Sequence, residues 1–131
     1  MLLGVDYGRA KLGLARAEGP LAEIYRVIRV ESIKDAVEKV AKVAQVEQAE
    51  RVIVGVSEGR MAEEQKDFAK RLGDKLDIPV KTWDETLSTL DAQALTISMG
   101  IGRKRRREKE DAYAALIMLQ SFIDSKRNSN V

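Results

Sequence analysis

The alternation of hydrophobic and polar residues predicts five β-strands. They cover residues 2–6, 12–17, 22–30, 51–56 and 80–83. The first three strands follow one another through short turns, which predicts an antiparallel meander. The fourth is a β-branched run flanked by polar residues, which is typical of a buried parallel strand. The first strand ends directly in an acid, Asp6, followed by a turn at Gly8, where we expect positive φ or close backbone approach.

Apolar residues at helical spacing predict four helices, at 33–48, 62–76, 90–99 and 111–124. Ser32 and Asp35 have the spacing of a capping box at the start of the first helix. The run of basic residues before the last helix is predicted to be a loop, and the polar tail from Ser125 is expected to fray. Hairpin-linked strands followed by alternating units predict an α/β domain, with a mixed five-stranded sheet covered by helices.

The composition excludes several kinds of chemistry. The 131 residues include no Cys and no His, which excludes disulfides, thiolate and His bases, and most zinc sites. Acid–base chemistry must therefore use carboxylates, Lys, Tyr or a metal-bound water. We find no signal peptide and no apolar segment of membrane length, so we expect a cytoplasmic protein without a membrane partner.

The charge is distributed unevenly. The net charge is +2, but residues 103–107 are five consecutive basic residues, and the rest of the chain would carry −3 without them. A mildly acidic body with one basic patch is typical of contact with a polyanion. A solvated loop would have the same composition, so the charge alone leaves both interpretations open.

Three acids stand at the ends of predicted elements. Asp6 ends the first strand, Glu85 follows the last strand, and Asp111 opens the last helix. If the first strand is central, the three can converge at one edge of the sheet. Neighbouring carboxylates repel unless a cation neutralises them, and oxygen ligands suit Mg²⁺ or Mn²⁺. Two such ions can activate a water at a phosphodiester.

Each acid also has an ordinary structural interpretation. Asp6 can cap the turn that follows it, and acids such as Glu85 and Asp111 are common at helix starts. Spacing does not decide between Asp84 and Glu85.

Several motifs, in order along nearly the whole chain, resemble the YqgF/RuvX family. They are Gly4-Val5-Asp6-Tyr7-Gly8, Leu12-Gly13-Leu14-Ala15, Val52-Ile53-Val54-Gly55-Val56, Asp84-Glu85-Thr86-Leu87-Ser88-Thr89, and the basic run with the helix that starts at Asp111. The family is described as pre-ribosomal-RNA nucleases and as Holliday-junction-resolvase-like proteins. The resemblance implies an RNase H-like fold with strand order 3-2-1-4-5, which we expect as a single domain over residues 1–131 with a frayed tail at 126–131.

The resemblance implies a metal-dependent endonuclease that acts on structured RNA, such as the 16S ribosomal RNA precursor. It implies Asp6, Glu85 and Asp111 as the catalytic acids and the ligands of Mg²⁺ or Mn²⁺, and it prefers Glu85 to Asp84. We expect the nucleic acid to contact the basic residues Arg9, Lys11, Arg103, Lys104, Arg105, Arg106 and Arg107.

The chain departs from the family pattern at three positions. Ser57 stands where the family usually has Pro, Thr86 where it usually has Arg, and Lys11 where it often has Arg. Without Arg at 86, the motif lacks a bidentate phosphate partner. Two alternatives therefore stay open: a Holliday junction resolvase acting on branched DNA, which would be a two-fold dimer, and a nucleic-acid-binding regulatory protein that cuts poorly. The sequence is compatible with a monomer or a homodimer.

Overall fold

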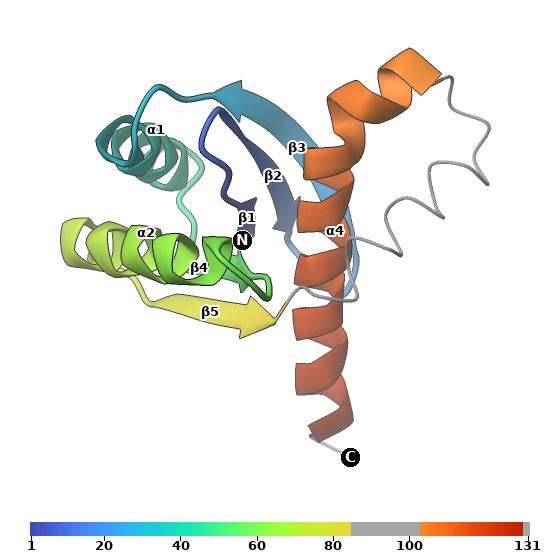
Figure 1. Cartoon of the computed structure of the whole chain (residues 1–131). Helices are drawn as coiled ribbons and strands as arrows, with labels where there is room; N and C mark the ends of the chain where they lie inside the picture. Colours follow the sequence, from blue (N-terminus) through green and yellow to red (C-terminus); the bar gives the residue numbers. More distant parts are fainter. Residues whose placement is uncertain (85–102, 130–131) are drawn as a thin grey trace.

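The computed structural model of the chain describes residues 1–84 and 103–129, with side chains described at 1–84 and 112–126 (Figure 1). The elements are, in order, β1 (Leu2–Asp6), β2 (Lys11–Ala17), β3 (Ala22–Arg29), α1 (Ile33–Val46), β4 (Arg51–Val56), α2 (Met61–Lys75), β5 (Val80–Asp84) and α4 (Arg103–Ser129). The helix predicted at 90–99 lies outside the described residues.

The strands form one mixed sheet in the order β3-β2-β1-β4-β5. β2 is antiparallel to β1 and β3, whereas β4 is parallel to β1 and β5 is parallel to β4. The predicted topology is therefore confirmed. β1 is the central strand, with Val5 paired to Leu14 on one side and to Val54 on the other.

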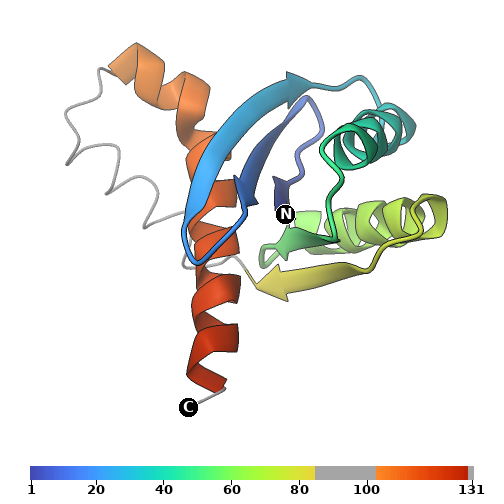
Figure 2. The ribbon, with the colours of Figure 1, turned by 180° about the vertical axis from the view of Figure 1, so that it is seen from behind.

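Helices cover both faces of the sheet, as Figures 1 and 2 show from opposite sides. α1 and α2 lie on one face, where Leu3, Val5 and Val54 belong to a buried cluster with Phe68 and Leu72 of α2. α4 lies on the other face, where a second cluster joins residues of the sheet and of α4: Ala15, Ala17, Ile53, Ala115, Met118, Leu119 and Phe122. Alternate residues of each strand therefore face different helices.

The start of α1 confirms the predicted capping box. Ser32 is the N-cap, and its Oγ accepts a hydrogen bond from the Asp35 backbone N–H at 3.0 Å. The Asp35 carboxylate accepts a 2.9 Å bond from the Glu31 backbone N–H and pairs with Lys39 one turn later. The Glu31 bond, followed by Lys39, lowers the pKa of Asp35. These contacts satisfy N–H groups that a helix start leaves unpaired.

The basic run is not a loop, so that prediction is wrong. Residues 103–107 form the first turns of α4, which begins at Arg103 instead of Asp111 and continues to Ser129 instead of ending at Asp124. Positive charge at a helix N-terminus is unfavourable by about 0.3–1 kcal/mol per charge. Arg, Lys and Glu have high helix propensity, however, and opposite charges recur four residues apart at Lys104 and Glu108.

Among the described residues α4 is the longest helix, and none of the helices there is long and apolar enough to span a bilayer. The helix approaches β1 very closely. A Cβ atom on Gly4 would lie 2.9 Å from the Cβ of Leu119. Glycine at this position therefore lets α4 lie directly against the central strand.

Candidate functional site

Asp6 is the last residue of the central strand, and its side chain is half-buried. Leu3 and Val5 belong to the cluster beneath α1 and α2, whereas Gly4 meets Leu119 of α4. Strand alternation therefore places Asp6 on the face that α4 covers. The parallel strands β1, β4 and β5 end at this same edge of the sheet, and open α/β sheets bind ligands beyond the carboxyl ends of their strands.

β5 brings the second acidic motif to the same edge. Val56 pairs with Asp84, the last residue of β5. Trp83 packs in the α4 cluster, so alternation puts the exposed Asp84 on the opposite face. Glu85 lies outside the described residues.

The third predicted acid, Asp111, is in the described helix α4, although its side chain lies outside the described set. Ala115 and Met118, four and seven residues further on, are fully buried in the α4 cluster. Over residues 1–84 and 112–126, no group of three or more Asp, Glu, His or Cys side chains could hold a metal. The convergence of all three acids therefore stays a prediction.

A polar cluster fixes the segment that follows Asp6. Tyr7 is buried and stacks on Phe68 at 4.8 Å between ring centroids, and its hydroxyl donates to Glu64 Oε1 at 3.0 Å. Arg9 Nε donates to Glu64 Oε2 at 2.7 Å. Burial, followed by the Glu64 bond, raises the pKa of Tyr7 to about 12. The Arg9 bond, followed by the Tyr7 bond, lowers the pKa of the Glu64 carboxyl.

This cluster holds Arg9, a predicted nucleic-acid contact, at the carboxyl edge. The Arg9 side chain remains 74% exposed. The sequence did not reveal Glu64, because an acid in the first turn of a helix is common and carries no further signal.

A second connection ties two loops of this edge to α2. Gln65 is the buried polar residue of the described chain, 3% exposed. Its Oε1 accepts bonds from the Ser57 backbone N–H at 2.8 Å and from Ser57 Oγ at 3.1 Å, and its Nε2 donates to the Tyr7 carbonyl at 3.5 Å. The departure at Ser57 thus has a local role, because proline has no N–H to donate.

The turn between β1 and β2 requires close backbone approach at Gly8, one of the two roles predicted for it. A Cβ atom there would lie 2.6 Å from the carbonyl oxygen of Lys11. Lys11 is the exposed first residue of β2. The basic residues 103–107 occupy the first turns of α4, and their side chains are outside the described set.

Solved structures with the same architecture include two resolvases. T. thermophilus RuvC in complex with a Holliday junction substrate matches with a TM-score of 0.63 at 15% identity, covering 98% of this chain and 96% of that chain. The fowlpox virus Holliday junction resolvase matches with a TM-score of 0.61 at 12% identity, covering 95% and 98%. These identities establish the fold alone, and the fold is that of the RNase H-like class.

The family model RuvX, described as Holliday junction resolvase, matches residues 1–125, so the chain belongs to the RuvX family of nucleases, which are hydrolases of phosphodiester bonds. Curated relatives from several organisms carry the name "Putative pre-16S rRNA nuclease". That of Desulforamulus reducens is 31% identical, over 95% of this chain and 96% of the relative. That of Halothermothrix orenii is 34% identical over 94% of each. The resemblance seen in the sequence motifs is confirmed.

Proposed function

We propose that the chain is a cytoplasmic, metal-dependent endonuclease that hydrolyses phosphodiester bonds of structured RNA, with the 16S ribosomal RNA precursor as substrate. One observation carries the proposal. Asp6 ends the central strand of an RNase H-like sheet, on the face covered by the helix that contains Asp111. The names of the curated relatives support RNA as the substrate.

Asp6, Glu85 and Asp111 are the proposed catalytic acids. The α4-facing position of Trp83 supports Glu85 over Asp84, because a residue two positions along a strand is expected on the same face. The burial of Ala115 and Met118 supports Asp111, because residues four and seven positions apart share one side of a helix. Both acids would then belong to the same face of the sheet as Asp6.

The donor set fits a hard divalent cation. The chain has no His or Cys, and Asp6 offers carboxylate oxygens at a half-buried strand end. When bound, Mg²⁺ or Mn²⁺ would polarise the phosphodiester and promote attack by water. The three carboxylates would hold the cation, and their mutual repulsion would disfavour the empty arrangement.

The basic residues are proposed to position the substrate. Arg9, held by Glu64, and Lys11 lie in the β1–β2 segment next to Asp6, and residues 103–107 lie on the same helix as Asp111. Contacts of Arg and Lys with phosphates orient a nucleic acid without reading its sequence. The chain would therefore recognise the shape of its substrate through the backbone.

The test is cleavage of a structured RNA by the purified chain with Mg²⁺ or Mn²⁺. Asp6→Asn should lower the cleavage rate at least about 100-fold, because the loss of a group essential to proton transfer or charge stabilisation has effects of this size. Asp84→Asn is the matched control, because it removes a carboxylate from the same edge but from the other face, and it should cut at the wild-type rate. Equal cleavage by wild type and Asp6→Asn would contradict the proposal and indicate a contaminating ribonuclease.

The family description favours a second substrate, a four-way DNA junction. The same assay with a matched junction decides between them. A resolvase cuts two strands symmetrically and is therefore expected to be a two-fold dimer. If a dimer of the chain cuts the junction in preference to RNA, the substrate would be the DNA junction. Tight, salt-sensitive RNA binding without metal-dependent cleavage would instead identify a binding protein.

A further inference from the structure

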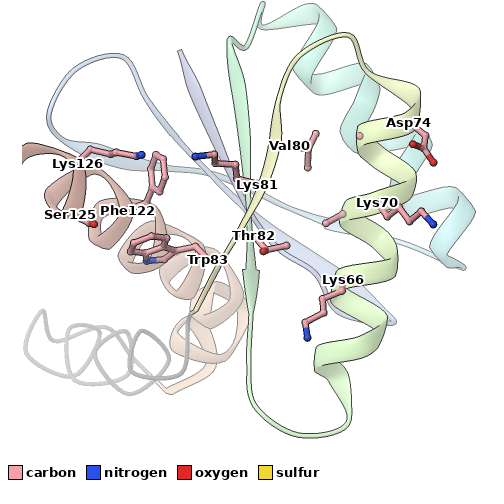
Figure 3. Close-up of a pocket in the computed structure, with 12 residues that line it drawn as sticks. Lys66, Lys70, Asp74, Val80, Lys81, Thr82, Trp83, Phe122, Ser125 and Lys126 are labelled. Atoms are coloured by element: carbon pink, nitrogen blue, oxygen red, sulfur yellow. The ribbon is translucent and has the colours of Figure 1, made fainter. Parts of the chain in front are cut away.

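A basic trough runs along β5, the edge strand of the described sheet, between α2 and α4 (Figure 3). Its volume is about 880 Å³. Lysines from three elements line it: Lys66 and Lys70 from α2, Lys81 from β5 and Lys126 from α4. Asp74 is the one acid among its described lining residues. The lining residues therefore carry more positive than negative charge, although Lys66 is itself paired with Glu63 at 3.6 Å and the chain as a whole is nearly neutral.

Aromatic rings form part of the trough wall. Trp83 is half-buried and packs edge-on against Phe122, with 5.4 Å between ring centroids. Trp83 Nε1 donates to Ser121 Oγ at 3.3 Å, which fixes the orientation of the indole. Lys126 Nζ lies 5.6 Å from the centre of the Phe122 ring. Phe122 itself is buried, so Trp83 is the ring of this pair that stays partly exposed. A row of cations beside an ordered, partly exposed indole is a surface that single-stranded nucleic acid binds.

The trough lies close to the proposed catalytic edge. Trp83 pairs with Gly55, which directly follows Val54, and Val54 pairs with Val5. Trp83 is therefore level with Asp6, two strands away, or roughly 10 Å across the sheet. A polynucleotide at Asp6 could continue over the end of β5 into the trough without crossing any of the helices in residues 1–84 and 103–129.

We propose that the trough binds the phosphodiester backbone of the RNA substrate, as a contact area separate from residues 103–107. This inference rests on the proposed function, because it takes its occupant to be the same RNA.

Self-association through β5 is disfavoured by charge. A second copy related by a two-fold axis would bring its own Lys66, Lys70 and Lys81 against those of the first. Protection of the exposed strand edge explains Lys81 alone, because a lysine on an edge strand discourages strand pairing. It does not explain lysines supplied by helices on both sides of that strand.

The experiment measures binding of a fluorescently labelled RNA hairpin with a single-stranded extension, by anisotropy, in EDTA and at several salt concentrations. The trough variant is Lys70→Gln with Lys81→Gln. The control variant, Lys34→Gln with Lys42→Gln, removes the same charge from exposed positions on α1. The trough variant should raise the Kd roughly threefold to tenfold and reduce the salt slope by about 1.4, whereas the control should match wild type. Equal weakening in both variants, or none in the trough variant, would overturn the proposal.

Tryptophan fluorescence gives a test without substitution. Trp83 is the one tryptophan of the chain, so its emission reports on the trough. RNA should change this emission with the same midpoint as the anisotropy titration. Binding seen by anisotropy with unchanged emission would overturn the proposal.

The remaining outcomes separate this inference from the proposed function. RNA that fills the trough in EDTA but is not cut when metal is added would support the trough and reject the nuclease assignment. If polyglutamate binds more tightly than RNA, the occupant of the trough would be an acidic protein partner instead of RNA. If the trough variant differs from wild type in sedimentation mass but binds RNA with the same affinity, the occupant of the trough would be a second copy of the chain instead of RNA.

Discussion

Gly4 sets the distance between the sheet and α4. Its missing side chain leaves room for Leu119, with 2.9 Å between an added Cβ and the Leu119 Cβ. The clash involves the base of a side chain, which cannot rotate away. Gly4 therefore belongs to the packing of α4, although it lies only two residues from Asp6.

Gly4→Ala should lower the free energy of unfolding by about 1–3 kcal/mol, because the extra methyl overpacks a closed core. Gly19→Ala is the matched control, because a Cβ there meets nothing within 4 Å, and its effect should stay within about 0.5 kcal/mol. Urea denaturation of the two variants checks this. Similar stabilities for both would show that α4 can shift away from β1 at little cost.

At the scale of elements, Gln65 connects the loops that follow β1 and β4 to α2. Three hydrogen bonds converge on one buried amide, two from Ser57 and one to the Tyr7 carbonyl. The side chain thereby keeps the end of β4 in position beside the segment that follows Asp6. Its role is to position the edge, because it lies beneath the loops and is buried.

Gln65→Met should cost about 1–3 kcal/mol of stability, because the half-buried N–H of Ser57 loses its acceptor. Ser57→Ala removes the hydroxyl bond but keeps the N–H bond, so it should cost about 1 kcal/mol or less. Thermal unfolding measures both. If Gln65 positions the edge, Gln65→Met should also lower the kcat of RNA cleavage more than it raises the KM, whereas a purely structural role would leave both constants unchanged in the folded fraction.

The beginning of α4 shows where the sequence was misleading at this scale. Five cations next to one another predict a solvated loop, and acids at 108, 110 and 111 imitate a helix start. The helix begins earlier because residues 103–107 have high intrinsic helix propensity. The basic residues 103–107 therefore lie on a helix instead of in a loop.

At the scale of the whole molecule, the topology could be predicted because each strand has a clear signal. Short turns required antiparallel pairing of the first three strands, and the helices after β3 and β4 required parallel pairing of the last two. The site was only partly predictable. Asp6 stands out as an acid at the end of an apolar run, but the bonds of Glu64 and Gln65 to Tyr7 join residues more than 50 positions apart, which spacing does not reveal.

Global stability should fall at alkaline pH because of Tyr7. Its folded pKa of about 12 exceeds the ordinary value of 10.0, so the folded state keeps a proton that the unfolded state releases. The stabilisation is complete below pH 10 and is lost as pH rises from 10 toward 12, by roughly 1 kcal/mol between pH 9 and pH 11. Tyr7→Phe lacks this contribution, so urea denaturation of both proteins should show a steeper alkaline loss in wild type. Parallel pH profiles would contradict the assignment.

The two faces of the sheet are completed at different stages of synthesis. α1 and α2 are made before β5, whereas α4 is the last of the described elements to emerge from the ribosome. Until it docks, the sheet surface around Ile53 and Ala15 lacks the cover that α4 provides among the described elements. Because one of the three proposed acids, Asp111, lies on this last helix, a nascent chain would form its sheet before it could cut RNA. Docking of α4 would then switch the nuclease on.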